Sequence, residues 1–279
     1  MLRLEEVSKR YGRGRWVLRE VSLDVSPSEV VAITGRNGSG KSTLLRLAVG
    51  ISRPTRGRVA SRACITGYVP ERFPPDERMP ALAYLTHVGR IRGLSTASAA
   101  RQASLLLDRL NLAGGRDVPL RTLSKGNAQK VAVAQAVLVP PDLLVLDEPW
   151  SGLDAAIHEV LGALIGEVSD SGTAVLFTDH REAVTSAYAS RTLTVDDGRV
   201  AEGLAGRVRS GYVTVRLAGS GSAIPSAAEW TALDGVREAV VDDAGITIRV
   251  RRASVDALLL HALGAGWSVV AVTPAGGAG

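Results

Sequence analysis

A short glycine-rich segment constrains this chain more than any other feature. Residues 35–43 fit the pattern G-x-x-x-x-G-K-[ST] and directly follow the apolar run 30–33. Its three glycines let successive backbone N–H groups turn toward phosphate oxygens at the start of a helix. The lysine supplies a point charge for the β- and γ-phosphates, and the serine hydroxyl can bind Mg²⁺. The pattern predicts a nucleoside triphosphate site formed by Gly35, Arg36, Asn37, Gly38, Ser39, Gly40, Lys41, Ser42 and Thr43.

Length and composition limit the architecture. The 279 residues can bury the core of one good-sized domain and a smaller one. The single cysteine, Cys64, cannot form an internal disulfide, and we expect it to be a buried small residue in a reducing compartment. Residues 1–6 lack a signal-peptide pattern, and the long apolar stretch 131–146 is interrupted by polar residues and prolines. We therefore expect a cytoplasmic protein that does not itself span a membrane.

The positive charge of the chain does not by itself indicate a nucleic-acid partner. The formal net charge is +5, and the arginines are scattered along the sequence without a run of five or six basic residues. Composition is a sufficient explanation of such a charge. We expect neither nucleic acid nor any metal beyond Mg²⁺ as a partner.

Hydrophobic periodicity predicts an α/β fold around the phosphate loop. Alternating residues predict an antiparallel β-layer ahead of the loop, and continuous apolar runs predict parallel strands that are buried on both faces. Apolar residues at helical spacing predict a helical subdomain at about 72–140, inserted after the loop. The alternating segments are 2–7 and 17–25, the apolar runs are 30–34, 143–146 and 174–178, and the helical segments are 81–92, 97–111 and 126–139.

A change in composition at 203–211 predicts the end of the first domain. We expect domains at 1–205 and 206–273, followed by a disordered tail at 274–279. The second domain shows the order strand, helix, strand, strand, helix, strand, which is the βαββαβ pattern of ferredoxin-like α+β domains. Its one histidine, His261, is expected on a helix surface or in the core rather than in a catalytic cluster.

Two carboxylates follow a buried strand. The run Leu143 to Leu146 ends in Asp147 and Glu148, which could form a solvated turn. Beside a phosphate loop, however, Asp147 is expected to bind the Mg²⁺ shell through Ser42 or water. Glu148 is then expected to orient and polarise the attacking water.

A second helix start carries groups suited to an anion. Ser124 and Gly126 place a hydroxyl and bare N–H groups at a helix N-terminus, which taken alone is equally well a helix cap. Their position between the phosphate loop and Asp147-Glu148 makes the chain resemble the nucleotide-binding subunit of an ABC transporter over residues 1–205. The resemblance implies that Ser124 and Gly126 contact ATP held by a second copy in a head-to-tail dimer. Lys125 and Asn127 depart from the family signature Leu-Ser-Gly-Gly-Gln.

The resemblance assigns three further residues. Asp154, in the sequence Ser-Gly-Leu-Asp, matches the D-loop, which couples the two sites of the dimer. His180 matches the switch histidine, which contacts the γ-phosphate. Tyr11 resembles the aromatic residue that stacks on adenine, with Trp16 as a rival. Trp150 stands where threonine is usual, and we interpret it as a packing residue.

Glu71 is the largest departure from the family pattern. It stands where glutamine is usual, and its carboxylate can still bind Mg²⁺. Together with the signature and the C-terminal extension, this residue makes the chain look like the ATPases of type-2 ABC exporters. The segment 72–93 is then expected to dock a separately encoded permease, which holds the subunit on the inner face of the membrane.

The resemblance implies an ATP hydrolase. Lys41 and Mg²⁺ would stabilise charge, Glu148 would orient or deprotonate water, and His180 would hold the γ-phosphate. One alternative is a soluble ABC-type protein that acts on ribosomes or DNA, but this chain has one cassette and no sustained heptads. A regulator without turnover is disfavoured because Lys41, Asp147, Glu148 and His180 are all present. The extension after residue 211 is expected to serve dimer contact or regulation, with simple packing as the alternative.

Overall fold

The chain divides into two compact units, Met1–Gly206 and Arg207–Gly279. A computed structural model describes residues 1–61, 63–73, 78–202, 212–218, 227–242, 245–251 and 254–274. The expected domain boundary at 203–211 and the expected tail from 275 onward lie outside the described residues. The two units are therefore considered separately.

A six-stranded sheet forms the centre of the first unit, in the order β5-β6-β7-β3-β8-β9. The first five strands are parallel, and β9 is antiparallel to β8. The three strands expected from continuous apolar runs are confirmed and lie together at its middle as β6, β7 and β3. The strands are β3 (Val30–Thr34), β5 (Thr66–Val69), β6 (Leu143–Asp147), β7 (Ala174–Thr178), β8 (Arg191–Asp196) and β9 (Arg199–Glu202).

A second sheet is antiparallel and has three strands, of which two come before the phosphate loop in sequence and one comes after it. Its order is β2-β1-β4, and its strands are β1 (Leu2–Arg10), β2 (Trp16–Val25) and β4 (Arg56–Ser61). The first two confirm the predicted β-layer. The third was not predicted because it contributes no buried residue and shows no apolar alternation.

Both faces of the central sheet are buried, which explains why its strands are apolar without interruption. Val31 and Ile33 of β3 pack with helix α1 (Lys41–Ala48) and with the antiparallel sheet. Val30 and Ala32 of the same strand pack in a second cluster with residues of the other helices. The sheet thus lies between two hydrophobic layers of the same unit.

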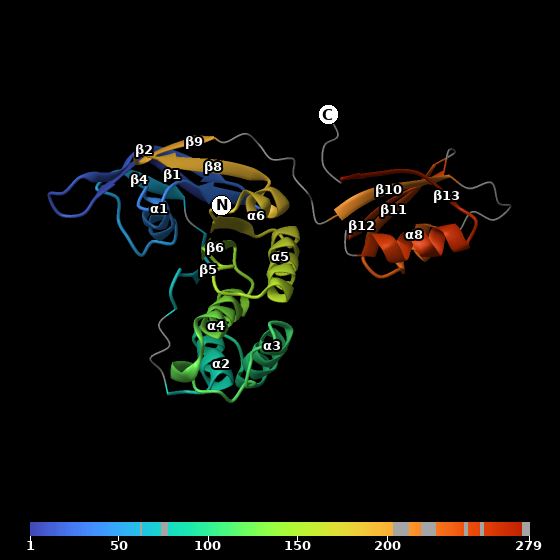
Figure 1. Ribbon diagram of the computed structural model, residues 1–279, viewed down its shortest axis with the longest axis horizontal. Coiled ribbons are helices and arrows are strands. Elements are labelled where there is room, and N and C mark those ends of the chain that lie inside the picture. Colours follow the sequence, from blue (N-terminus) through green and yellow to red (C-terminus); the bar gives the residue numbers. More distant parts are fainter. Residues whose placement is uncertain are drawn as a thin grey trace. The chain divides into compact units, whose positions relative to one another are not determined.

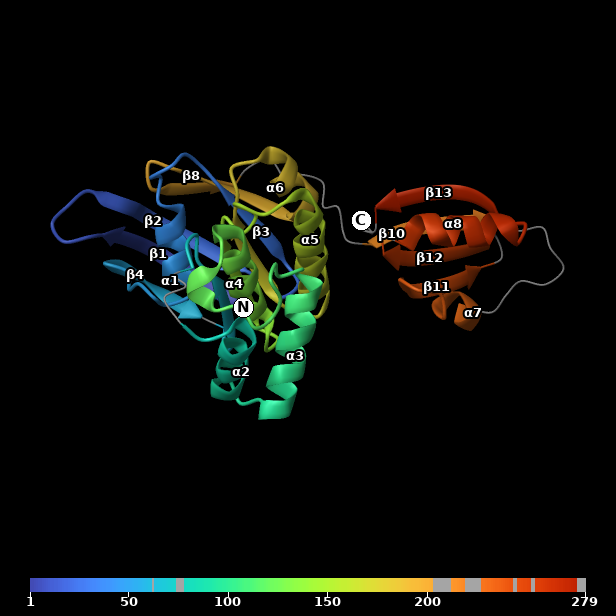
Figure 2. The same cartoon turned by 60° about the horizontal axis from the view of Figure 1, so that its bottom comes forward.

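The remaining helices of the unit include the expected helical subdomain. In Figures 1 and 2, α2, α3 and α4 gather on the side away from the antiparallel sheet. Their observed ends lie within two residues of the predicted ones. Residues 74–77 of the expected docking segment lie outside the described part of the chain. The elements are α2 (Ala81–Ile91), α3 (Thr96–Arg109), a 3₁₀ turn (Leu120–Thr122), α4 (Lys125–Val137), α5 (Ala155–Asp170) and α6 (Glu182–Tyr188).

The second unit has the predicted βαββαβ order. Its sheet runs β11-β12-β10-β13 with antiparallel neighbours, the arrangement of a ferredoxin-like fold. Figure 2 shows α8 lying across this sheet. His261 is exposed on the surface of α8, which is one of the two places expected for it, and its ring lies edge-on to Trp230. The elements are β10 (Tyr212–Ala218), α7 (Ala227–Thr231), β11 (Val236–Asp242), β12 (Gly245–Arg251), α8 (Val255–Gly264) and β13 (Ser268–Pro274).

The expectation that Cys64 is buried was wrong. Its side chain is exposed, and it lies in the loop between β4 and β5. The neighbouring Ile65 is also exposed, and its backbone N–H donates to the Asp142 carboxylate at 2.9 Å. The short apolar run therefore belongs to a connection held by a side-chain hydrogen bond rather than to the core. Among the residues that the structure covers, no helix is long and apolar enough to cross a membrane.

Candidate functional site

Three loops meet at the carboxyl edge of the central sheet. Strands β6, β7 and β3 are parallel neighbours, so the segments that follow them emerge side by side. These segments hold the phosphate loop, the Asp147-Glu148 pair and His180. Ligands of open α/β sheets bind at this edge. The fold therefore brings together motifs that are more than a hundred residues apart in sequence.

The phosphate loop needs glycine at its two ends. Gly35 has φ +136° and Gly40 has φ +114°, values that side chains disfavour. A Cβ atom at Gly35 would lie 2.3 Å from the carbonyl oxygen of Val195, and one at Gly40 would lie 2.8 Å from that of Val17. The loop thus approaches neighbouring backbone closely before α1 begins at Lys41. The first N–H groups of such a helix lack intrahelical partners and suit a phosphate.

The charged end of Lys41 lies within the curve of the loop. Lys41 is 7% exposed, and its Nζ donates to the carbonyl oxygens of Gly35 at 2.8 Å and Arg36 at 3.1 Å. Ser42 follows on the first turn of α1 and is partly buried. The structure therefore holds an ammonium group and a hydroxyl beside the N–H groups of the loop, as a triphosphate requires.

Tyr11 lies close to the same helix start. Its hydroxyl is 3.4 Å from the Thr43 Oγ1, and its ring is 51% exposed. Partial burial alone would raise the pKa of Tyr11, but hydrogen bonds to Thr43 and Arg46 and the charges of Lys9 and Arg46 lower it overall. An exposed ring at this place suits stacking of a base.

Cations lie over the rings of both aromatic candidates. Two guanidinium groups lie over the ring of Trp16, those of Arg10 at 4.9 Å and Arg56 at 5.2 Å from its centroid. Lys9 Nζ likewise lies 5.0 Å from the centroid of the Tyr11 ring. These contacts therefore do not separate the two residues, and what distinguishes Tyr11 is its hydroxyl beside Thr43 at the start of α1.

A buried threonine joins the Asp147 carboxylate to the backbone of Glu148. Asp147 is 2% exposed, and its Oδ1 accepts from Thr178 Oγ1 at 2.8 Å. The same Oγ1 accepts from the backbone N–H of Glu148 at 2.8 Å. Glu148 has φ +50°, a conformation that costs a non-glycine residue about 1–3 kcal/mol. Thr178 could not be singled out from the sequence, because a threonine at the end of a buried strand is common.

Glu71 follows the strand next to Asp147. It is exposed two residues beyond β5, which pairs with β6. Burial and the charge of Asp147 raise the pKa of Tyr68, and the charge of Glu71 adds to this, while Arg46 opposes it. Both carboxylates therefore act on one tyrosine, which places Glu71 near the Asp147 end of the site. Across the described ranges, no cluster of three or more His, Cys, Asp or Glu residues is present, and Mg²⁺ commonly uses one or two carboxylates with phosphate oxygens.

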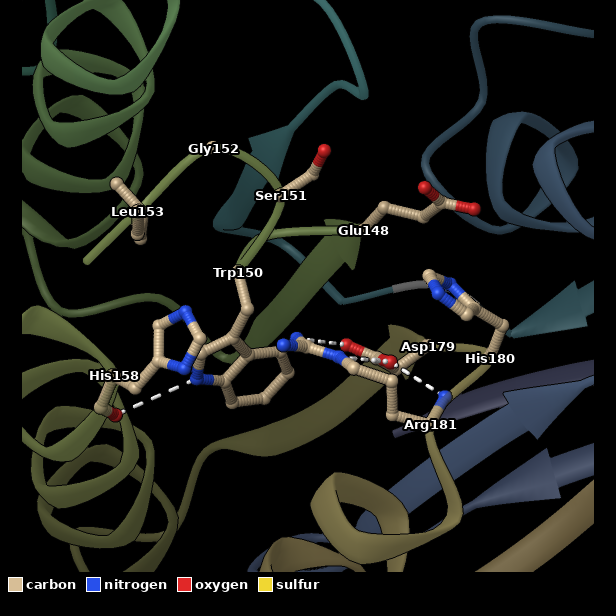
Figure 3. A pocket seen from close by; sticks show the side chains of 9 residues that line it. All are labelled: Glu148, Trp150, Ser151, Gly152, Leu153, His158, Asp179, His180 and Arg181. Carbon is tan, nitrogen blue, oxygen red and sulfur yellow. Dashed lines mark hydrogen bonds and ion pairs between the residues drawn. The ribbon is translucent and has the colours of Figure 1, made fainter. Parts of the chain in front are cut away.

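A pocket opens beside Glu148 and His180. Figure 3 shows both side chains at the same end of this pocket, Glu148 from the loop after β6 and His180 from the loop after β7. The cavity has a volume of about 200 Å³, and His180 is exposed. The structure thus brings these two predicted residues together. The lining residues are Glu148, Trp150, Ser151, Gly152, Leu153, His158, Asp179, His180 and Arg181.

Trp150 is a packing residue, as interpreted from the sequence. It is 1% exposed, and its ring stacks on Tyr188 with centroids 5.4 Å apart and an interplanar angle of 13°. Phe177 of β7 meets the same ring edge-on at 5.2 Å. The indole therefore anchors the loop after Glu148 to β7 and α6.

The segment at Ser124 packs against the D-loop of the same chain. Ser124 caps α4 by accepting from the Asn127 N–H at 3.3 Å. A Cβ atom at Gly126 would lie 2.4 Å from the carbonyl oxygen of Gly152, and Lys125 Nζ donates to Ser151 Oγ at 3.0 Å. The departure at Lys125 therefore ties two loops together.

Asp154 and Asn127 have contacts within the chain as well. Asp154 caps α5 by accepting from the Ile157 N–H at 3.0 Å. The Asn127 Oδ1 accepts from the Ala113 N–H at 3.3 Å. Asp154 thus fixes the start of α5, and Asn127 ties the first turn of α4 to the loop that contains Ala113.

The comparisons with known proteins agree with this geometry. The sequence model described as "ABC transporter" matches residues 18–151. A zinc import ATP-binding protein from Cereibacter sphaeroides is 37% identical over 205 residues, which are 73% of this chain and 82% of that protein. The chain belongs to the ABC transporter ATP-binding family. An aliphatic sulfonates import ATP-binding protein from Mycobacterium avium is 38% identical to this ABC ATPase over 72% of its chain and 80% of the relative.

Solved structures extend the comparison. The ATP-binding subunit of an ABC transporter superposes with a TM-score of 0.67 at 29% identity, over 73% of this chain and 89% of that one. A dimeric cassette in a post-hydrolysis state with ADP and Pi superposes with a TM-score of 0.66 at 25% identity, over 73% and 98%. The α/β fold expected from the sequence is thereby confirmed. This ABC ATPase binds ATP and Mg²⁺ and hydrolyses ATP.

The expectation of an exporter is contradicted. The names of the zinc, sulfonate and sulfate relatives all describe import. The error arose because Glu71, the signature departures and the C-terminal extension were given weight for direction. Glu71 and the signature residues bear on Mg²⁺ and ATP, so their chemistry carries no information on the direction of transport.

Proposed function

We propose that this ABC ATPase drives a separately encoded membrane permease by closing a head-to-tail dimer around two MgATP molecules. Each ATP would lie between the phosphate loop of one copy and the Ser124–Gly126 segment of the other. The subunit would be held at the inner face of the membrane through the permease. Solved relatives that are described as dimeric cassettes support the dimer.

The roles of the residues follow from their chemistry. Lys41 and the N–H groups of the loop would bind the phosphates, and Ser42 with Asp147 would hold Mg²⁺, with Glu71 as a further oxygen ligand. Mg²⁺ supplies charge neutralisation for phosphoryl transfer. Tyr11 would stack on the base.

Hydrolysis requires groups at the γ-phosphate. Glu148 would orient the attacking water and accept its proton, and His180 would donate a hydrogen bond to the γ-phosphate from the same end of the pocket. Thr178 would hold the Asp147 carboxylate and the backbone of Glu148 in fixed positions through its two hydrogen bonds.

One observation carries the dimer proposal. The segment that would meet the partner's ATP packs through Gly126 on Gly152, which follows Glu148 by four residues. A partner phosphate that moves Ser124 would therefore move the loop that leaves Glu148. This contact gives a short route between the two ATP sites of a dimer.

The direction of transport that best fits the relatives is import. Zinc, aliphatic sulfonates and sulfate are named as the imported species of relatives with 33–39% identity. Such variety does not define one cargo for this chain. We propose import without a specific substrate class.

Reconstitution with a candidate permease tests the proposal. A candidate permease is here the product of any neighbouring reading frame that encodes several apolar helices of about 20 residues each. We expect it to co-purify with the full chain and to raise the ATPase rate in lipid vesicles. Absence of both co-purification and stimulation for every such neighbour would contradict the role in transport. Glu148→Gln is the control for ATPase activity that does not come from this chain.

A further inference from the structure

A buried carboxylate lies directly before His180. The Asp179 side chain is 3% exposed and makes an ion pair with Arg181, whose side chain is 36% exposed. The Arg181 Nε donates to Asp179 Oδ1 at 3.0 Å, and Nη2 donates to Oδ2 at 2.9 Å. This fork-shaped contact fixes both planar groups and is among the stronger hydrogen-bond geometries. Figure 3 shows the pair crossing the pocket wall next to His180.

A third bond closes the backbone around the histidine. Asp179 Oδ1 also accepts from the backbone N–H of Arg181 at 2.8 Å. A side-chain acceptor bonded to the N–H two residues later forms a turn of which the middle residue is His180. His180 itself is exposed, so its own side chain contributes little to holding its place. The backbone position of His180 is therefore set by the contacts between its two neighbours.

The charge of Glu148 reaches the Arg181 guanidinium group. The hydrogen bonds that Arg181 donates to Asp179 are the main cause that raises the pKa of Arg181, and the charge of Glu148 contributes in the same direction. The guanidinium group is thus within the field of the carboxylate that would orient water. Asp179 holds this cation in a defined place beside Glu148.

We propose that Asp179 and Arg181 form a clasp that positions His180 for its contact with the γ-phosphate. The clasp is defined as the three hydrogen bonds between Asp179 and Arg181. This inference rests on the proposed switch role of His180. Asp179 acts through His180 and is a positioning residue, because its carboxylate is buried and fully engaged by Arg181.

A double-mutant cycle on the full chain tests the clasp. Asp179→Asn keeps the size of the side chain but replaces an acceptor of the guanidinium fork by an NH₂ group. We expect kcat to fall about 10- to 100-fold, the scale of a misplaced catalytic group, while KM for ATP stays unchanged. In the His180→Ala background the same change should lower kcat less than about 2-fold, since the positioned group is already gone.

A matched ion pair provides the control. Arg109 and Glu167 form a two-bond contact with distances of 2.7 Å, on α3 and α5. Glu167→Gln disrupts it as Asp179→Asn disrupts the clasp, and it should leave kcat unchanged. Arg181→Lys is the second clasp variant if Asp179→Asn does not fold, because lysine keeps the charge and loses the fork. It should show the same dependence on His180.

The outcomes separate the clasp from the proposed function. Full kcat in Asp179→Asn, or an equal loss in both backgrounds, would overturn the clasp while leaving the role of His180 intact. If His180→Ala alone keeps full kcat, the switch role fails first, and the clasp has no group to position. A loss of kcat in Glu167→Gln as large as that in Asp179→Asn would show that the effect is general destabilisation and would also overturn the clasp.

Discussion

A glycine in the middle of α5 makes room for the aromatic stack that anchors the D-loop. A Cβ atom at Gly162 would lie 2.2 Å from Cε1 and 2.6 Å from the hydroxyl of Tyr188. Ordinary contacts of this kind are 3.4–4 Å long, so the tyrosine ring has to move by more than about 1 Å. The same ring stacks on Trp150 at 5.4 Å. Gly162→Ala is therefore expected to separate Tyr188 from Trp150.

The magnitude follows from three contributions. Overpacking costs about 1–3 kcal/mol, and loss of the stacked pair costs about 0.5–1.5 kcal/mol. Alanine in place of glycine within a helix returns about 0.5–1 kcal/mol. The free energy of unfolding should fall by about 0.5–4 kcal/mol in Gly162→Ala.

The control is another glycine of the same helix. A Cβ atom at Gly166 would have no neighbour within 4 Å, so Gly166→Ala should raise the free energy of unfolding by about 0.5–1 kcal/mol. Urea unfolding followed by tryptophan fluorescence compares the two variants. Tyr188→Ala should remove most of the cost of Gly162→Ala, because the clashing ring is absent. Equal stability of Gly162→Ala and Gly166→Ala would refute the reasoning.

Three further changes have defined expectations. Gly126→Ala places a Cβ atom 2.4 Å from the carbonyl oxygen of Gly152 and forces the start of α4 away from it. This change should lower kcat about tenfold or more. ATP binding to the single chain, measured by the fluorescence of a labelled nucleotide, should stay unchanged. Lys41→Gln removes a charged partner of the phosphates and should raise the Kd for ATP about 10- to 100-fold in the same assay. Burial, followed by the charge of Glu159, raises the pKa of Tyr188. The folded protein therefore favours the protonated phenol of Tyr188. The free energy of unfolding should fall as pH rises from about 10 through the pKa of the folded state, because the phenol then has to ionise in a partly buried place. Tyr188→Phe should flatten that part of the pH profile of the unfolding free energy.

The elements that could be predicted from the sequence are those whose residues are nearly all buried and therefore apolar. The strands 30–34 and 174–178 are buried at nearly every residue, so their patterns carried the signal. β4 contributes no buried residue and escaped prediction, because it pairs through its backbone with β1. Cys64 was misplaced for the same reason, since three apolar or small residues in a row do not distinguish a strand from a connection.

The candidate site was predictable where the residue type is dictated by local chemistry. Glycines at 35 and 40 and the charge of Lys41 are required by the loop itself. Thr178, Asp179 and Arg181 were missed because their roles come from contacts between separate elements or from a side chain that meets its own backbone. The direction of transport was wrongly predicted because Glu71 and the signature residues bear on Mg²⁺ and ATP rather than on the transported molecule.

The central claim is that ATP is bound between two copies of this chain. Size-exclusion chromatography with light scattering tests it most directly. Glu148→Gln should bind MgATP without turning it over, and the account predicts a dimer with MgATP and a monomer without nucleotide. Adding Ser124→Arg, on the exposed cap of α4, should abolish the dimer. A monomer of Glu148→Gln at saturating MgATP, or an equally stable dimer with Ser124→Arg, would contradict the account.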